Sequence, residues 1–192
     1  MEAKAFRAIK PEIRVLGIDD GKFTPRTQGN VILVGVVFRG GSWLEGVMHT
    51  SIAIDGYDAT EQIASMINNS PHCKQLRLIM LNGITVAGFN VVDIQKLHLA
   101  TKLPIIVLMR EKPDLDAIHK ALNNLPRSDE RWNMILNAGR ILEMSCRGKT
   151  LYMEIAGISE VDAIKVVELT STRSSFPEPL RVAHLIASGI TL

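Results

Sequence analysis

The sequence predicts an α/β protein with a mixed sheet and helices on both faces. Two observations lead to this prediction. Residues 13–54 contain three short apolar segments joined by turn-forming residues, which is typical of an antiparallel three-strand meander. After residue 58, helical apolar spacing alternates with further short apolar runs, which predicts helices that connect strands of the same sheet.

The meander is predicted from its strands and from the turns between them. The first strand covers residues 13–19, where branched apolar residues run up to two acidic residues. Residues 20–30 are rich in turn formers and predict a loop. Strands over 31–40 and 43–54 follow, and the adjacent glycines at 40 and 41 predict a tight connection between them.

The remaining elements follow from apolar spacing and from capping residues. Helices are predicted over 58–70, about 90–100, about 114–124, 128–138, 159–171 and 178–190, strands over 77–81 and 104–109, and a strand–turn–strand over 140–157. Asp58 and Glu61 have the spacing of a capping box. Ser159 is predicted to cap its helix, and Gly189 is predicted to close the last one.

The composition predicts a soluble protein with one domain, residues 1–192. Of the 192 residues 46% are apolar, and the chain has no low-complexity segment, long linker or repeat. Two cysteines do not make a disulfide framework. The first residues lack the apolar core of a signal peptide, and no apolar run reaches the roughly 20 residues of a membrane span. We therefore expect a cytoplasmic location, while a net charge of +2 neither requires nor excludes a nucleic-acid partner.

Carboxylates occur at the predicted strand ends and helix starts. Asp19 ends the first strand, Asp58 and Glu61 open the first helix, and Asp93 lies early in the next helix. Phosphoryl-transfer sites hold Mg²⁺ or Mn²⁺ with carboxylates that converge from separate elements, so these acids predict a metal site. Each acid also has a structural interpretation as a turn or cap residue. The structural interpretation is weakest for Asp19, because a carboxylate buried at a strand end is costly without a partner.

Three other side chains complete the predicted site. Asn82 follows the strand at 77–81, where its carbonyl oxygen could bind a cation without adding charge, although Asn82-Gly83 is also ordinary turn chemistry. Arg110 follows the strand at 104–109 and could face either phosphate or solvent. Lys22, in the predicted loop over 20–30, is a second candidate for substrate binding. The five histidines have no metal-binding spacing and are predicted to be surface or helix-packing residues.

The order of elements is that of the ribonuclease H-like architecture, and also of other mixed α/β folds. The segments "LGIDDG", "IDGYDATEQI", "LIMLNGITVAGFNVVDI", "PIIVLMR" and "FPEPLRVAHLIASGI" together resemble an uncharacterised, mainly archaeal family, the domain of unknown function ninety-nine. The resemblance covers nearly the whole chain. That family is itself distantly similar to endonuclease V, a ribonuclease H-like nuclease that cleaves near deaminated bases, so the resemblance implies one endonuclease V-like domain.

The nuclease pattern can be carried over residue by residue. Its first-strand aspartate falls on Asp19, its helix-opening glutamate falls near Asp58 or Glu61, and its strand-end lysine falls near Arg110. Its third acid, in a Val-Asp-Gly motif, falls on Asn82, so an amide stands in place of a carboxylate. No histidine is present where the nuclease has a Gly-His segment before the penultimate helix. The resemblance therefore implies a nuclease scaffold with a depleted acidic site.

Three classes of function remain open from the sequence. The first is a divalent-metal-dependent nuclease acting on DNA or RNA, with Asp19, Glu61 and Asn82 as catalytic residues and with Asp58 and Asp93 as further metal ligands. The second is a module that binds nucleic acid or a nucleotide without cutting, which the missing carboxylate favours. The third is a structural or assembly protein whose acids are turns and caps.

Overall fold

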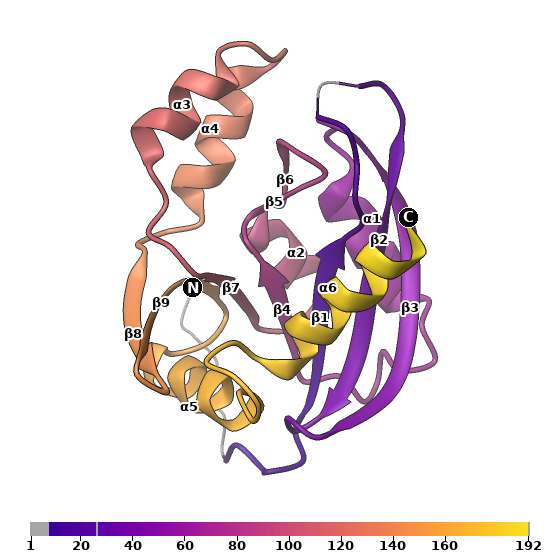
Figure 1. The fold of residues 1–192 in the computed structure, drawn as a ribbon, viewed down its shortest axis with the longest axis vertical. Helices are drawn as coiled ribbons and strands as arrows, with labels where there is room; N and C mark the ends of the chain where they lie inside the picture. The colour runs from indigo at the N-terminus through magenta and orange to yellow at the C-terminus, as the bar shows by residue number, and fades with distance from the viewer. Residues whose placement is uncertain (1–7, 26, 192) are drawn as a thin grey trace.

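A seven-stranded mixed sheet forms the centre of the structure. The computed structural model describes residues 8–25 and 27–191, so the first part of the amino-terminal segment lies outside this description. The strands are β1 (Arg14–Asp20), β2 (Asn30–Arg39), β3 (Trp43–Ala53), β4 (Leu78–Asn82), β7 (Ile105–Met109), β8 (Leu142–Cys146) and β9 (Lys149–Ala156). Across the sheet their order is β3-β2-β1-β4-β7-β9-β8 (Figure 1).

The pairing confirms the predicted meander and mixed sheet. β1, β2 and β3 pair antiparallel in sequence order, β1, β4 and β7 are parallel, and β9 runs antiparallel to β7. Because the central strands are apolar over nearly their whole length, both faces of the sheet are covered by other elements. The parallel arrangement brings the carboxyl ends of β1, β4 and β7 to one edge of the sheet.

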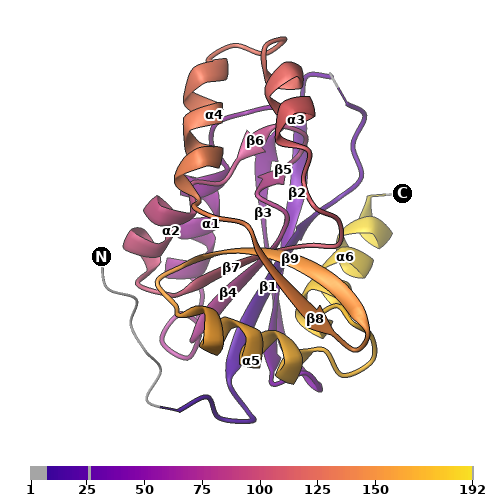
Figure 2. The same cartoon turned by 90° about the vertical axis from the view of Figure 1, so that its left-hand side faces the viewer.

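Helices lie on both faces of the sheet. Their bounds are α1 (Ala59–Asn68), α2 (Ile94–Thr101), α3 (Leu115–Leu122), α4 (Ser128–Asn137), α5 (Glu160–Thr170) and α6 (Glu178–Ile190). α1 and α2 contribute to the hydrophobic cluster on one face, and α5 and α6 pack on the other. The antiparallel pair α3 and α4 extends beyond the edge formed by the carboxyl ends of β1, β4 and β7 (Figures 1 and 2).

Two predicted capping interactions are wrong, although Asp58 is the N-cap residue of α1 and α6 ends at residue 190 as predicted. Asp58 and Glu61 do not form a capping box, because Asp58 accepts hydrogen bonds from the backbone of Ala53 and Glu61 pairs with Lys96. Gly189 does not close α6, which continues to Ile190. The predicted cap at Ser159 is confirmed, since its hydroxyl accepts from the Asp162 amide.

One small element was not predicted. β5 (Thr85–Val86) and β6 (Asn90–Val91) form a two-stranded hairpin just after β4. Its turn contains Ala87 and Gly88, both with positive φ, and a side chain on Gly88 would collide with the Asp55 carboxylate. Such a short hairpin has too few residues for a periodic signal, so only its tertiary contacts identify it.

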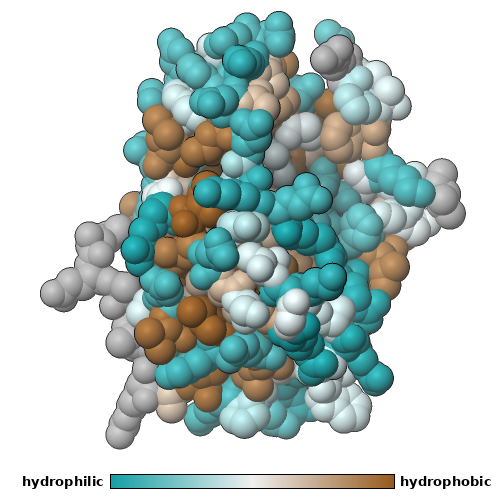
Figure 3. Space-filling view, turned by 60° about the vertical axis from the view of Figure 1, so that its left-hand side comes forward, coloured by the Kyte–Doolittle hydropathy of each residue, from teal (hydrophilic) through white to brown (hydrophobic). Residues whose placement is uncertain are grey.

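No described helix is both long enough and apolar enough to cross a membrane. On the face shown in Figure 3, apolar side chains form several small groups that are separated by hydrophilic ones. Scattered apolar groups of this kind are common on the surfaces of globular proteins.

Glu154 in β9 has a buried carboxylate with few hydrogen bonds to offset the loss of water. Glu154 pairs with Val107 of β7, so its side chain lies on the same side of the sheet as that of Val107. Its Oε2 atom has no hydrogen-bond partner among the described residues. Burial raises the pKa of Glu154 from 4.5 to about 7. The folded protein thus holds the proton of Glu154 more tightly than the unfolded chain does. The contribution of this proton to the free energy of unfolding is complete below pH 4.5 and is lost as the pH rises through about 7.

We expect Glu154→Gln to remove this loss of stability. At pH 8.5 the variant should unfold with a free energy about 1–3 kcal/mol higher than the wild type, and the difference should vanish near pH 4. Urea denaturation across this pH range measures it. Glu143→Gln, an exposed change on the neighbouring strand β8, is the matched control and should have no effect. A variant that follows the pH dependence of the wild type would show that folding does not raise the pKa of Glu154.

Candidate functional site

Asp19, Asn82 and His184 meet at the carboxyl ends of the central strands. The Asp19 side chain is only 5% exposed, and its Oδ2 accepts a hydrogen bond of 3.1 Å from the Asn82 amide nitrogen. Nδ1 of His184 lies 2.8 Å from the same oxygen. One carboxylate oxygen therefore joins β1, β4 and α6.

The strand register brings Asp19 and Asn82 together. Ile18 pairs with Leu81 across the parallel strands β1 and β4, so the next residue on each strand points to the opposite face, the one covered by α6. This register explains why Asn82 is more than a turn residue: its amide donates to Asp19, and the turn itself is made at Gly83, which has a φ of 84°.

A close helix–strand contact brings His184 to Asp19. Pro179 in α6 packs on Gly17, where a Cβ atom would lie 2.4 Å from the proline backbone, so only glycine permits this approach. Gly17 precedes Asp19 by two strand residues, and Pro179 precedes His184 by five helix residues. Both separations are about 7 Å, which lets the histidine reach the aspartate when the proline contacts the glycine.

Burial and hydrogen bonding act in opposite directions on Asp19. Burial is the largest effect and, with the charge of Asp20, raises the pKa of Asp19 from 3.8 to about 6, although the hydrogen bond from Asn82 and the proximity of His184 lower it. When Asp19 is ionised it accepts a hydrogen bond from protonated Nδ1 of His184. The side chain of His184 is 61% exposed, so this tautomer presents the Nε2 lone pair towards solvent.

Asp20 and Lys22 extend the site into the neighbouring loops. Oδ2 of Asp20 accepts a hydrogen bond of 2.6 Å from the Ala87 amide, which fixes the end of β1 against the turn between β5 and β6. The amide of Lys22 donates to the Thr191 hydroxyl at the end of α6, and the side chain of Lys22 is exposed. Lys22 thus lies at the same edge of the sheet as Asp19, as a substrate-binding role would require.

The other predicted acids have different partners. Asp58 accepts from the Asn90 amide at 2.6 Å, Glu61 pairs with Lys96 on the surface, and Asp93 caps α2 by accepting from the Lys96 amide. Among residues 8–25 and 27–191, no group of three or more His, Cys, Asp or Glu side chains could hold a metal ion. The predicted site of Asp19, Asp58, Asn82 and Asp93 is therefore not assembled there: Asp58 is held by the Asn90 side chain and the Ala53 amide, and Asp93 by the Lys96 amide.

Arg110 follows β7 at this edge and is exposed. Its guanidinium stacks on the ring of Phe176, 4.0 Å from the ring centroid. A stacked guanidinium keeps its N–H groups in its own plane and free at the edges, so this contact orients Arg110 without occupying its donors.

A cavity of about 690 Å³ opens beside the edge. It is lined by Phe23, Pro25, Thr27, Gln28, Ile54, Asp55, Gly88, Phe89, Ala121, Asn124, Leu125 and Pro126. These residues come from the loop after β1, the segment after β3, the β5–β6 turn and the α3–α4 pair. The amide of Ala87, the residue before the lining residue Gly88, donates to Asp20 and thereby connects the β5–β6 turn to the end of β1. Apolar walls with a few polar groups are typical of small-ligand sites.

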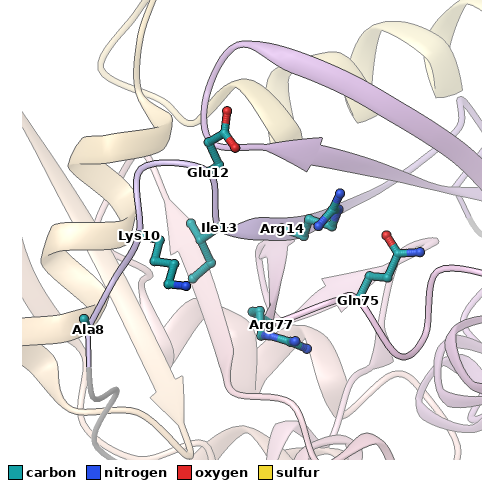
Figure 4. A pocket seen from close by; sticks show the side chains of 7 residues that line it. All are labelled: Ala8, Lys10, Glu12, Ile13, Arg14, Gln75 and Arg77. Carbon is teal, nitrogen blue, oxygen red and sulfur yellow. The ribbon is translucent and has the colours of Figure 1, made fainter.

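A second cavity, of about 340 Å³, lies at the opposite end of β1 (Figure 4). Lys10, Arg14 and Arg77 are among its lining residues. Arg14 pairs with Glu45, and Arg77 donates to backbone carbonyls, so much of this positive charge is already engaged. Arg14 is separated from Asp19 by about 17 Å of strand, which excludes this cavity from the site around Asp19.

Sequence reasoning missed His184. The sequence predicts a surface or packing residue at this position. Its hydrogen-bond partner, Asp19, lies 165 residues away in the chain, so no local pattern links the two. His184 lies in the segment "FPEPLRVAHLIASGI", which forms α6, but no spacing within that segment indicates which strand the helix crosses.

Comparisons with known proteins place these features in context. The model of the endonuclease dU family matches residues 11–191. A relative from Methanothermobacter thermautotrophicus, named UPF0215 protein, is 53% identical over 193 residues that cover 100% of this chain and 94% of the relative.

Solved structures share the fold. A protein of unknown function from Archaeoglobus fulgidus is 40% identical and superposes with a TM-score of 0.84 over 93% of this chain and 98% of that one. Endonuclease V of Ciona intestinalis, in complex with a 24-mer DNA containing an inosine, is 11% identical with a TM-score of 0.58 over 89% of this chain and 82% of that one. The predicted ribonuclease H-like fold is thereby confirmed.

Proposed function

This chain belongs to the endonuclease dU family, and we propose that it is an endonuclease that hydrolyses a phosphodiester bond of DNA near a deoxyuridine. The observation that carries the proposal is the group of Asp19, Asn82 and His184, in which a buried carboxylate holds an exposed imidazole at the carboxyl edge of the sheet. The substrate class comes from the name of the family, and the DNA bound to a structural neighbour supports nucleic acid as the partner.

His184 is suited to act as the general base. Asp19 holds Nδ1–H and stabilises the imidazolium that forms when Nε2 takes a proton from the attacking water. The water oxygen then bonds to phosphorus, and the bond from phosphorus to one ester oxygen breaks. That oxygen takes a proton from solvent water, and Nε2 afterwards releases its proton to solvent. Asn82 keeps Asp19 oriented through its amide, and the exposed Arg110 and Lys22 supply positive charge for the phosphate.

A divalent cation fits this group only together with the substrate. The chain provides one carboxylate, Asp19, and the amide oxygen of Asn82, which its bond to Asp19 leaves free. Mg²⁺ accepts one or two carboxylates when phosphate oxygens and water complete its shell. Mg²⁺ or Mn²⁺ held there would neutralise charge on the phosphate.

The cavity is suited to a base taken out of the DNA stack. Enzymes that act near one base commonly hold it between apolar and aromatic side chains and read its edge with polar groups. Phe23 and Phe89 offer aromatic surface, and Gln28 and Asn124 offer amide groups.

One observation favours a second function, binding without cleavage. Asn82 stands where the nuclease pattern has an acid, and no three-acid group is formed among the described residues. A non-cutting module would bind DNA in a salt-dependent way with no requirement for metal.

A cleavage assay separates these functions. The substrate is a duplex with one deoxyuridine, and the control is the same duplex with thymidine, each with Mg²⁺, with Mn²⁺ or with chelator. We expect cleavage of the deoxyuridine strand alone, and only with metal. Binding of the deoxyuridine duplex without cleavage in any condition would support the binding module instead. Absence of both binding and cleavage would overturn the proposal.

A further inference from the structure

Arg131 in α4 is a fully buried arginine, with 0% of its surface exposed. Among the residues that the structure describes, no carboxylate forms an ion pair with it. Its guanidinium donates instead to four backbone carbonyls, those of Pro126 (from Nε, 3.3 Å), Gly56 (from Nη1, 3.0 Å), Phe89 (from Nη1) and Asp55 (from Nη2). The ring of Tyr57 lies 3.9 Å from the guanidinium carbon.

Three of these four carbonyls belong to residues that line the 690 Å³ cavity, namely Asp55, Phe89 and Pro126. They come from three segments that are distant in sequence: the β3–α1 connection, the β5–β6 hairpin and the α3–α4 connection. One planar group with five fixed donors therefore joins three walls of the cavity.

The cost of burying a cation indicates what Arg131 adds. A buried charge without a carboxylate is expensive, and an apolar side chain of similar length would fill the space without that cost. What an apolar residue would lack is the fork of donors that holds the segments at fixed separation. Asp55 reinforces the same arrangement, since its Oδ1 accepts from the Phe89 amide and its own amide donates to Ala87.

We infer that Arg131 is a positioning residue that sets the shape of this cavity and thereby the recognition of the base. The part of the inference that concerns the base rests on the proposed function. The part that concerns the cavity walls does not, because it follows from the four hydrogen bonds alone.

Hydrogen exchange in Arg131→Lys tests the cavity walls without any substrate. Lysine keeps the charge, but its single nitrogen cannot span the three segments. We expect the amides of Asp55 and Phe89 to exchange about tenfold faster, while the amide of Ile79 in β4 keeps its wild-type rate. Arg127→Lys is the matched control, because Arg127 also stacks on Tyr57 but bonds only to the exposed Glu130. Arg131→Gln is the second variant if the lysine does not fold.

Cleavage kinetics test recognition of the base. On the deoxyuridine duplex, Arg131→Lys should raise KM about tenfold with little change in kcat, since Arg131 touches neither Asp19 nor His184. Unchanged exchange at Asp55 and Phe89, or equal acceleration at Ile79, would overturn the inference. If the wild type cuts no DNA, the proposed function fails, and the exchange result still decides whether Arg131 positions the cavity walls.

Discussion

Asp19→Asn is expected to abolish cleavage while making the protein more stable at pH 8. The amide has no charge to stabilise the imidazolium, and its N–H group can donate to Nδ1 and so select the wrong tautomer of His184, which should lower cleavage on the order of 10³–10⁴-fold. The same change removes a buried charge. Because the amide keeps the size and shape of the carboxyl group, its oxygen still accepts a hydrogen bond from Asn82.

The direction of the stability change follows from the pKa of Asp19, which is raised from 3.8 to about 6. The wild type is stabilised by the proton of Asp19 below pH 3.8, and it loses that stabilisation as the pH rises through about 6. At pH 8 with chelator, Asp19→Asn should therefore unfold with a free energy about 1–3 kcal/mol higher than the wild type, and the gain should disappear near pH 4.

Urea denaturation at the two pH values, beside the cleavage assay, measures both effects. Asp116→Asn, an exposed change in the first turn of α3, is the control and should alter neither stability nor cleavage. Cleavage at the wild-type rate in Asp19→Asn would overturn the catalytic role. A loss of stability at pH 8 would instead show that the charge of Asp19 holds α6 on the sheet.

His184→Gln is expected to slow cleavage about 10²–10³-fold with almost no change in stability. Glutamine can still donate an N–H to Asp19, but it cannot take a proton from water. The small effect on stability follows from the exposure of the side chain, 61%, which leaves little packing to lose.

The pH profile of kcat identifies the role of His184. If Nε2 of His184 takes the proton of the attacking water, His184→Gln should lose a pH dependence of kcat that the wild type shows. His49→Gln, an exposed histidine on the edge strand β3, is the matched control and should behave as the wild type. A His184→Gln protein that keeps both the wild-type rate and the wild-type profile would exclude the general-base role.

The α/β fold and one half of the site were predictable from the sequence. The apolar runs at β1, β2, β4 and β7 predict buried strands, because the pattern that indicates a strand lies within a few consecutive residues. Once β1 and β4 are placed side by side, Asp19 and Asn82 must lie at the same edge. The cap at Ser159 was predictable for the same local reason, since a cap and the amide it accepts from lie within one helical turn.

The tertiary structure alone decided the partners of these residues. His184 reaches Asp19 only because Gly17 allows Pro179 to approach the sheet, a contact between opposite ends of the chain. Asp58 looked like a cap, yet Asn90 and the end of β3 take its carboxylate. The sequence by itself determined which strands form and where their polar ends lie, because those depend on local periodicity. Which helix crosses those ends, and which loops Arg131 joins, depends on packing between distant segments, and no local pattern records it.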